Sequence, residues 1–174
     1  MPITFLGLGS NVGDRERNIG KALDAIQERY EILNFSSLYE TEPVGVEDQP
    51  RFLNMVVCID SRDSSPEELL RFVKSAEKEI GREKSFRWGP RSIDVDILLI
   101  DGVAYESEEL SVPHRELLNR NFVLVPLSEM QGRVSVKGKE ILIVDRIAAN
   151  SAEGQKVSLF KRKEELRKGR SANP

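Results

Sequence analysis

Two amphipathic helical stretches set between short apolar runs constrain the fold of this 174-residue chain most strongly. In the first stretch, from Asp14 to Tyr30, apolar residues recur at helical spacing. The second has clear boundaries, because Ser65 is a good N-cap, Pro66 suits a first helical turn and Gly81 can end a helix. These patterns predict two helices that each bury one face.

The runs around these helices are rich in β-branched and aromatic residues and predict strands at 3–8, 32–39, 52–59 and 93–100. The resulting order, β-α-β-β-α-β, is that of an α/β (α+β) fold, a ferredoxin-like sandwich. We expect additional C-terminal strands at 122–127 and 134–144, the latter as a hairpin across Lys137-Gly138-Lys139. Residues 157–166 have the pattern of a basic amphipathic helix.

Charge is unevenly distributed along the chain. The net charge is -3, but residues 151–174 hold seven basic and three acidic side chains, a net of +4, so residues 1–150 carry -7. Within this acidic body lies a basic cluster around Arg82, Lys84 and Arg91. A local positive patch on an acidic protein favours a small polyanionic ligand over long nucleic acid.

The sequence shows neither a membrane span nor a secretory signal. Apolar runs such as 97–100 are far too short to cross a bilayer, and no charged segment followed by an apolar one opens the chain. The single cysteine, Cys58, cannot form an internal disulfide and is expected to be a small core residue. These features predict a cytoplasmic protein.

Asp94 and Asp96 stand at the start of a predicted strand. Side chains on a strand alternate between its faces, so these two carboxylates project from the same face. Like charges held this close repel unless a cation lies between them, and oxygen ligands suit magnesium, which also binds substrate phosphates. The alternative is that both side chains solvate a strand end, since short metal motifs have false positives.

The residues immediately before the two aspartates, 82–92, are basic and aromatic. Guanidinium groups bind phosphate oxygens in bidentate fashion, and the indole of Trp88 can stack on a base. Phosphate ligands adjoining metal ligands supply the positioning and charge neutralisation that phosphoryl transfer requires. The alternative is a solvated basic loop. The chain's only tryptophan lies in this segment, which argues against that alternative.

Other candidate motifs are less specific. His114 is the only histidine and could donate to a phosphate, with Arg120 and Phe122 following in the same short segment; a structural role is the alternative, and no cluster supports zinc. The glycines at 7, 9 and 13 do not have the spacing of a dinucleotide fingerprint, and no P-loop motif occurs. If ATP binds, another architecture must hold it.

Several short segments occur together in a specific order. They are 8–11 (LGSN), 41–45 (TEPVG), 48–54 (DQPRFLN), 81–82 (GR), 87–96 (RWGPRSIDVD), 112–114 (VPH) and 120–122 (RNF). On these segments, and above all on 87–96, the chain resembles the 6-hydroxymethyl-7,8-dihydropterin pyrophosphokinase family. The resemblance covers roughly residues 3–147.

The resemblance implies a pyrophosphokinase of tetrahydrofolate biosynthesis. Such an enzyme transfers pyrophosphate from ATP, its co-substrate, to 6-hydroxymethyl-7,8-dihydropterin, giving the pterin diphosphate and AMP. It also implies two magnesium ions, held between Asp94, Asp96 and the ATP phosphates. Residues 1–147 would form the catalytic domain and residues 148–174 a basic C-terminal appendage. The expected partners are the two small-molecule substrates, with no nucleic acid and no membrane, in a monomer or weak homo-oligomer.

The resemblance also assigns expected roles to individual residues. Lys84 stands where family members often have a second arginine, and Arg115 where they often have an aromatic residue. The expected catalytic residues are Arg82, Arg91, Asp94 and Asp96; the pterin-binding residues are Thr41, Pro43, Val44, Phe52, Asn54 and Phe122; the nucleotide-binding residues are Glu77, Lys84, Trp88, Arg91, Ile97, His114 and Arg120.

Two other classes of function remain open. Ferredoxin-like sandwiches can present aromatic side chains to single-stranded RNA, although the alternating basic, glycine and aromatic pattern of such a strand is missing here. The chain could also be a degenerate, purely structural relative of the pyrophosphokinases. The intact set of aspartates, aromatic residues and arginines argues against this alternative.

Overall fold

The computed structural model describes residues 3–42, 49–81 and 92–171. Its centre is a six-stranded sheet with the order β10-β3-β4-β1-β5, in which β2 also pairs with β4. Every pairing in the sheet is antiparallel. The strands are β1 (Ile3–Ser10), β2 (Glu31–Phe35), β3 (Leu38–Thr41), β4 (Phe52–Asp60), β5 (Asp94–Ile100) and β10 (Val157–Lys161).

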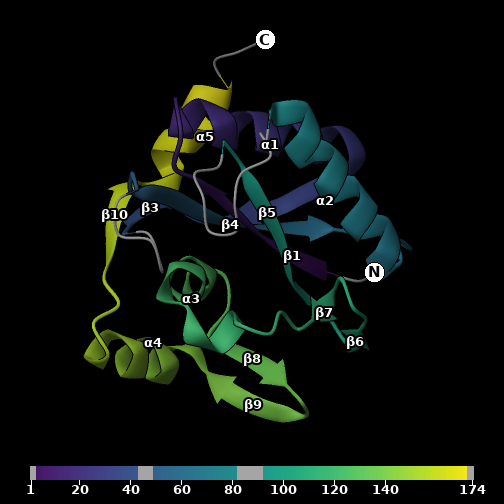
Figure 1. Cartoon of the computed structure of the whole chain (residues 1–174), viewed down its shortest axis with the longest axis vertical. Helices are drawn as coiled ribbons and strands as arrows, with labels where there is room; N and C mark the ends of the chain where they lie inside the picture. The colour runs from purple at the N-terminus through teal and green to yellow at the C-terminus, as the bar shows by residue number, and fades with distance from the viewer. Residues whose placement is uncertain (1–2, 43–48, 82–91, 172–174) are drawn as a thin grey trace.

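Helices α1 (Arg15–Arg29) and α2 (Pro66–Ile80) cover one face of this sheet, and α5 (Lys163–Ser171) lies beside α1 (Figure 1). The predicted helix boundaries are confirmed. Ser65 and Glu68 form a capping box at the start of α2, and Gly81 ends this helix in the left-handed conformation, with φ of 97°. The predicted β-α-β-β-α-β order and ferredoxin-like class are therefore confirmed.

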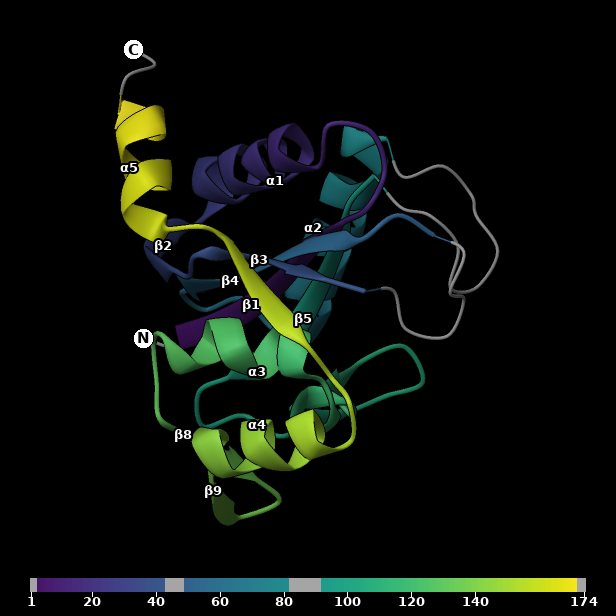
Figure 2. The ribbon, with the colours of Figure 1, turned by 90° about the vertical axis from the view of Figure 1, so that its left-hand side faces the viewer.

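A second layer covers the opposite face of the sheet (Figures 1 and 2). It consists of η1 (Leu117–Asn119), α3 (Asn121–Ser128), α4 (Ile143–Ala152) and the predicted hairpin, formed by β8 (Arg133–Val136) and β9 (Lys139–Leu142). The short strands β6 (Tyr105–Glu106) and β7 (Ser111–Val112) lead into it. Because both faces are covered, the sheet contributes to two separate cores.

Alternate residues of the central strands enter these two cores. Val57 and Ile97 pack toward α1 and α2, whereas Val56 and Leu98 pack toward α3. Cys58 lies unpaired in the core on the α3 side, as expected of a small apolar residue. This alternation also sends the polar residues near the strand ends to a defined face.

The C-terminal end of α3 is fixed to the sheet by a partly buried polar network. The carboxylate of Glu129 accepts hydrogen bonds from the backbone N–H of Ser37 at 2.9 Å and from the hydroxyl of Tyr39 at 2.8 Å. The Nζ atom of Lys163 lies 3.5 Å from the same carboxylate. Burial and the Glu129 carboxylate raise the pKa of Tyr39, so its hydroxyl remains a donor. The network joins α3, β3 and α5.

The predicted strand at 122–127 is wrong, because these residues form helix α3. Val123 and Val125 favour a strand, but a short apolar run does not distinguish a buried strand from a buried helix. Here the segment lies between the sheet and α4, with Val123, Leu124 and Leu127 buried. Burial on more than one side therefore determines the outcome, rather than local propensity.

Three other expected boundaries are corrected. The predicted helix at 157–166 is instead strand β10, which pairs with β3 (Val157 opposite Thr41), followed by α5. The free edge of β3 supplies backbone partners that helical periodicity cannot reveal. The strand expected at 32–39 divides into β2 and β3, and residues 143–144 begin α4 instead of ending the hairpin.

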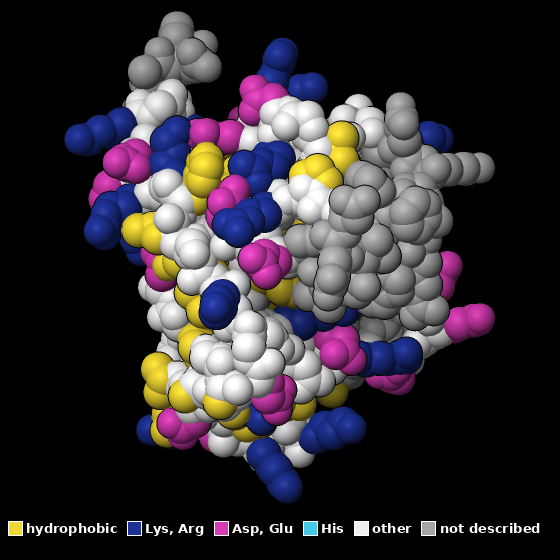
Figure 3. All heavy atoms as spheres, turned by 60° about the vertical axis from the view of Figure 1, so that its left-hand side comes forward, with side chains coloured by type: hydrophobic (Ala, Val, Ile, Leu, Met, Phe, Trp, Pro, Cys, Tyr) yellow, Lys and Arg dark blue, Asp and Glu magenta, His cyan; other side chains and the backbone are white. Residues whose placement is uncertain are grey.

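On the face that carries β10, hydrophobic side chains are interspersed with charged ones (Figure 3). Leu159 and Phe160 are exposed on this strand, and Val144 is exposed on α4. No helix in the described ranges is both long and apolar enough to span a membrane.

The α2 capping box gives a direct test of the fold. Replacing Ser65 with Ala should lower the free energy of unfolding by about 1 kcal/mol, because the N–H of Glu68 loses its acceptor. Urea denaturation followed by circular dichroism measures this change. Ser65→Asp, which keeps an acceptor, is the matched control, and equal loss in both variants would contradict the capping role.

Candidate active site

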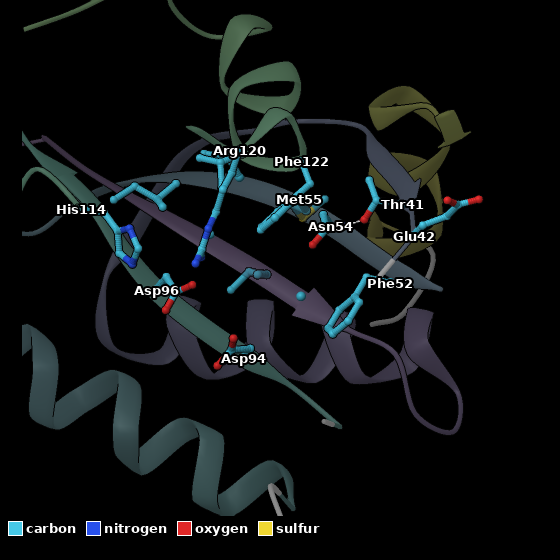
Figure 4. Close-up of a pocket in the computed structure, with 16 residues that line it drawn as sticks. Thr41, Glu42, Phe52, Asn54, Met55, Asp94, Asp96, His114, Arg120 and Phe122 are labelled. Carbon is cyan, nitrogen blue, oxygen red and sulfur yellow. Dashed lines mark hydrogen bonds between the residues drawn. The ribbon is translucent and has the colours of Figure 1, made fainter. Parts of the chain in front are cut away.

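A cavity of about 260 Å³ opens on the sheet face opposite α1 and α2. Strands β1, β4 and β5 form its floor, and the segment leading into α3 closes one side (Figure 4). Its polar lining includes Asp94, Asp96, His114, Arg120, Asn54 and Thr41, and its aromatic lining is Phe52 and Phe122. The structure thus brings together, around one cavity, expected site residues that lie far apart in the sequence.

The strand geometry expected for the two aspartates is confirmed. Asp94 and Asp96 both face the cavity from β5, while Val95 and Ile97 between and after them pack in the core under the helices (Figure 4). Burial, and then the neighbouring Asp94 carboxylate, raise the pKa of Asp96 from 3.8 to about 7. The site therefore holds negative charge at an energetic cost, which a cation would relieve.

Glu77 lies directly behind this pair. Its side chain is 2% exposed, accepts a hydrogen bond from the backbone N–H of Val95 at 2.9 Å, and lies 3.4 Å from the Nζ of Lys74. Burial raises the pKa of Glu77, and a hydrogen bond with Asp94 raises it further. Through this hydrogen bond with Asp94, α2 helps to hold the aspartate on the strand.

His114 is held against the outer edge of β5. Its backbone N–H donates to the carbonyl of Leu98 at 2.8 Å, and its Nδ1 accepts from the backbone N–H of Glu116 at 3.1 Å. Burial, and then the positive charge of Arg120, lower the pKa of His114. The neutral ring accordingly carries its proton on Nε2, as a hydrogen-bond donor.

Arg120 enters the cavity from the opposite layer, and its guanidinium points toward Asp96 (Figure 4). Its charge lowers the pKa of Asp96, against the larger effects of burial and Asp94. The Cζ atom of Arg120 also lies 5.6 Å from the centroid of the Phe122 ring. One cation thus lies between the acidic and the aromatic side of the cavity.

The aromatic end of the cavity has a defined polar edge. Asn54 donates from Nδ2 to the hydroxyl of Thr41 at 2.7 Å, which fixes the orientation of its amide. Gly9 passes close to this amide, because a Cβ atom at position 9 would lie 3.2 Å from the Asn54 Oδ1. The absence of a side chain at Gly9 therefore leaves room beside Asn54 and Phe52.

A second, wider cavity of about 630 Å³ adjoins the first. Asp96, His114 and Arg120 line both cavities, and the second is also lined by Lys74, Ile97 and Gln155. Two ligands bound in the two cavities would therefore meet beside the same carboxylate, imidazole and guanidinium.

The residues present fit a magnesium site that a substrate completes. Asp94 and Asp96 offer hard oxygen ligands on one strand face, and the raised pKa of Asp96 reflects charge that a divalent ion would offset. Magnesium commonly takes one or two protein carboxylates together with substrate phosphates. In the described part of the chain no cluster of three or more acidic, histidine or cysteine side chains forms a complete cage.

Six expected site residues lie outside the described residues: Pro43, Val44, Arg82, Lys84, Trp88 and Arg91. Sequence reasoning did not assign Gly9, Lys74 or Gln155 to the site. The signal for Gly9 was its place in the glycine-rich end of the first strand, and the signal for Lys74 was its position one helical turn before Glu77. Gln155 has no local signal.

The ferredoxin-like sandwich, the carboxylate pair and the basic groups across a two-part cleft together define a protein of the phosphoryl-transfer enzyme class. A family model described as 7,8-dihydro-6-hydroxymethylpterin-pyrophosphokinase (HPPK) matches residues 5–132. The chain belongs to this family. The expected family is thereby confirmed, and the alternative of a nucleic-acid-binding module gains no support.

Individual relatives agree with this assignment. The chain is 45% identical over 130 residues to the 2-amino-4-hydroxy-6-hydroxymethyldihydropteridine pyrophosphokinase of Bacillus subtilis, covering 74% of this chain and 77% of that protein. It is 44% identical over 134 residues to the protein of the same name from Aquifex aeolicus, covering 77% and 83%.

Among solved structures, HPPK-DHPS of Plasmodium falciparum matches with a TM-score of 0.64 at 16% identity. The match covers 88% of this chain and 44% of that one, so this chain spans under half of its length. At this identity the match supports the fold alone.

The raised pKa of Asp96 predicts a cost in stability. Since the folded state holds this proton more tightly than the unfolded state, stability without metal should fall as pH rises from the ordinary pKa of 3.8 through about 7. Asp96→Asn should therefore raise the melting temperature at pH 8 in EDTA, with the difference closing toward pH 4. Thermal unfolding across this pH range measures it, and a difference independent of pH would contradict the assignment.

Proposed function

We propose that this protein transfers the pyrophosphoryl group of ATP to the hydroxymethyl group of 6-hydroxymethyl-7,8-dihydropterin, giving the pterin diphosphate and AMP in tetrahydrofolate biosynthesis. The observation that carries the proposal is the pair of adjoining cavities that share Asp96, His114 and Arg120. The pterin occupies the smaller, aromatic cavity, and ATP occupies the wider one. Membership of the pyrophosphokinase family supports this choice of substrates.

The pterin ring stacks on Phe52 and Phe122, which enter the smaller cavity from β4 and α3 (Figure 4). Because the Nδ2 of Asn54 donates to Thr41, its Oδ1 is oriented to accept a hydrogen bond from the pterin's polar edge. Pro43 and Val44, which follow Thr41 in the sequence, are proposed to complete this edge through backbone groups. The hydroxymethyl group then faces Asp96 and Arg120.

The triphosphate of ATP lies between β5 and the segment that carries His114 and Arg120. The Nε2 of His114 donates to a phosphate oxygen, and the guanidinium of Arg120 neutralises phosphate charge. Ile97 lines the wider cavity, which is the proposed nucleotide site. Glu77 acts on this site indirectly, through its hydrogen bond with Asp94. Lys84, Trp88 and Arg91 are proposed to contact the nucleotide from residues 82–91.

Asp94 and Asp96 are the proposed ligands of magnesium, two ions in all, which when bound would neutralise phosphate charge and acidify the attacking hydroxyl. The pterin alcohol attacks the β-phosphorus in line and loses its proton to solvent; the new P–O bond forms as the bond to the α-phosphate oxygen breaks, and AMP leaves. Arg82 and Arg91 are the proposed catalytic arginines, offsetting charge that develops in the transition state.

Location and assembly follow the same proposal. A cytoplasmic enzyme is consistent with Cys58, which is buried and unpaired. We propose a monomer or weak homo-oligomer that needs no nucleic-acid partner, with the chemistry carried by residues 1–147 and with residues 148–174 as a basic C-terminal segment.

Formation of AMP from ATP, in the presence of magnesium and 6-hydroxymethyl-7,8-dihydropterin, tests the function. AMP release should depend on the pterin, and Asp96→Ala should abolish it while leaving the far-ultraviolet circular dichroism unchanged, because one of the two proposed metal ligands is lost. Lys139→Ala on the distant β8–β9 hairpin is the control and should turn over normally. Pterin-independent AMP release, or an active Asp96→Ala protein, would refute the proposal.

The stacking role of Phe122 predicts a loss in pterin affinity. Phe122→Ala should raise the KM for the pterin about tenfold or more, because stacking on an aromatic ring is worth roughly 1–3 kcal/mol per base. Steady-state kinetics at saturating ATP measure this change. Phe122→Tyr, which keeps the ring, should bind the pterin like the wild type; equal KM values in all three proteins would exclude stacking.

A further inference from the structure

We infer that Gln155 is a positioning residue for Arg120, holding the backbone on both sides of this arginine through its side-chain amide. The Nε2 of Gln155 donates to the carbonyl of Asn119 at 2.8 Å. Its Oε1 accepts from the backbone N–H of Asn121, also at 2.8 Å. The inference rests on the proposed function, in which Arg120 contacts phosphate.

The two hydrogen bonds bracket Arg120 in the manner of a neighbouring strand. An antiparallel strand would pair with a carbonyl and an N–H on one edge of an extended segment, and the planar amide of Gln155 supplies the same donor and acceptor. Arg120 itself is extended, with φ of -130° and ψ of 106°. The amide therefore stabilises the one residue that must orient the guanidinium.

Gln155 also satisfies an otherwise uncapped helix end. Arg120 is the N-cap of α3, and within the described part of the chain its side chain makes no capping hydrogen bond. Its carbonyl begins the helix, accepting from the N–H groups of Val123 and Leu124 at 3.0 Å. With Gln155 bound to the N–H of Asn121, the Arg120 backbone is fixed both by α3 and by a residue that lies 34 positions after Asn121 in the sequence.

The C-terminal end of α4 gives Gln155 a rigid base. The backbone N–H of Gln155 donates to the carbonyl of Asn150 at 3.2 Å. The side chain of Asn150, only 1% exposed, donates to the carbonyl of Leu118 and to the Oδ1 of Asn121, each at 3.1 Å. Asn121 in turn donates to the hydroxyl of Ser151 at 3.0 Å. Such buried, mutually satisfied polar groups resist displacement.

The placement of Arg120 matters because its guanidinium lines both cavities and points toward Asp96 (Figure 4). A long side chain amplifies a small change at its own backbone, and a misplacement of about 1 Å near the reacting atoms can cost roughly 100-fold in rate. Gln155 itself lies beyond residues 5–132, the part that the family model matches. The segment between α4 and β10 thus contributes to the site through Arg120.

Gln155 also lines the nucleotide cavity, so a direct contact with ATP is the competing explanation. The two explanations differ in their dependence on Arg120. A positioning residue has little left to do once the arginine side chain is removed, whereas a direct ligand keeps its own contribution.

The test compares AMP formation by full-length wild type, Gln155→Ala, Arg120→Ala and the double variant. Gln155→Ala should lower kcat about 10-fold to 100-fold, and it should have less than about a twofold further effect in the Arg120→Ala background. Ser158→Ala, which trims an exposed side chain from the same C-terminal segment, is the matched control and should equal the wild type. Additive losses, or a kcat of Gln155→Ala equal to that of the wild type, would overturn the inference.

A second variant guards against simple misfolding. Gln155→Glu has nearly the same shape and keeps an acceptor for Asn121, but places a carboxylate oxygen against the carbonyl of Asn119. It should keep the wild-type circular dichroism and lose kcat, and full activity in Gln155→Glu would overturn the inference. A wild-type protein that releases no AMP would instead overturn the proposed function. In that event, faster amide hydrogen exchange at Asn121 in Gln155→Ala would still support the role of Gln155 in holding the backbone around Arg120, and unchanged exchange would refute that role.

Discussion

Repulsion between the carboxylates of Asp94 and Asp96 has to be offset by groups from other parts of the fold. Strand β5 places both side chains on one face, and burial there makes ionisation of Asp96 costly. From beneath, α2 contributes Lys74, whose positive charge lowers the pKa of Asp96, whereas the charge of Glu77 raises it. From across the cleft, the second layer contributes Arg120. The two halves of the domain are therefore coupled by charge at the point where the two proposed substrates would meet.

The second layer is also what distinguishes this domain from a bare ferredoxin-like sandwich, in which one sheet face is open to solvent. Here that face is half core and half cleft: Val56 and Leu98 pack against α3, whereas Asn54 and Asp96 on the same strands line the cavities. Glu129 fixes one end of α3 to β3, and Gln155 holds the other end. The helix that presents Phe122 is thus restrained at both termini, which favours preorganisation of the proposed pterin site.

Features encoded locally were predictable from the sequence, and features created by distant contacts were not. The Ser65 N-cap and the shared face of Asp94 and Asp96 depend only on nearby residues, so both were predicted. The helix at 121–128 and the pairing of β10 with β3 depend on burial and on a free strand edge far away in the sequence, and both were mispredicted. Gln155 could not be found for the same reason, because a lone glutamine carries no periodicity or motif that links it to Arg120.

The pairing of β10 with β3 has a consequence for how the enzyme is made. Ribosomal synthesis proceeds from the N-terminus, so β1 to β5 can assemble while the residues that form β10 are still to be added. Until then the backbone edge of β3, next to Thr41, has no strand to cover it, and nascent chains on one polysome could pair through it. Completion of the last strand therefore covers this edge and protects the newly made domain from its neighbours. The same late step brings Gln155 to the backbone on both sides of Arg120, where the proposed activity requires it.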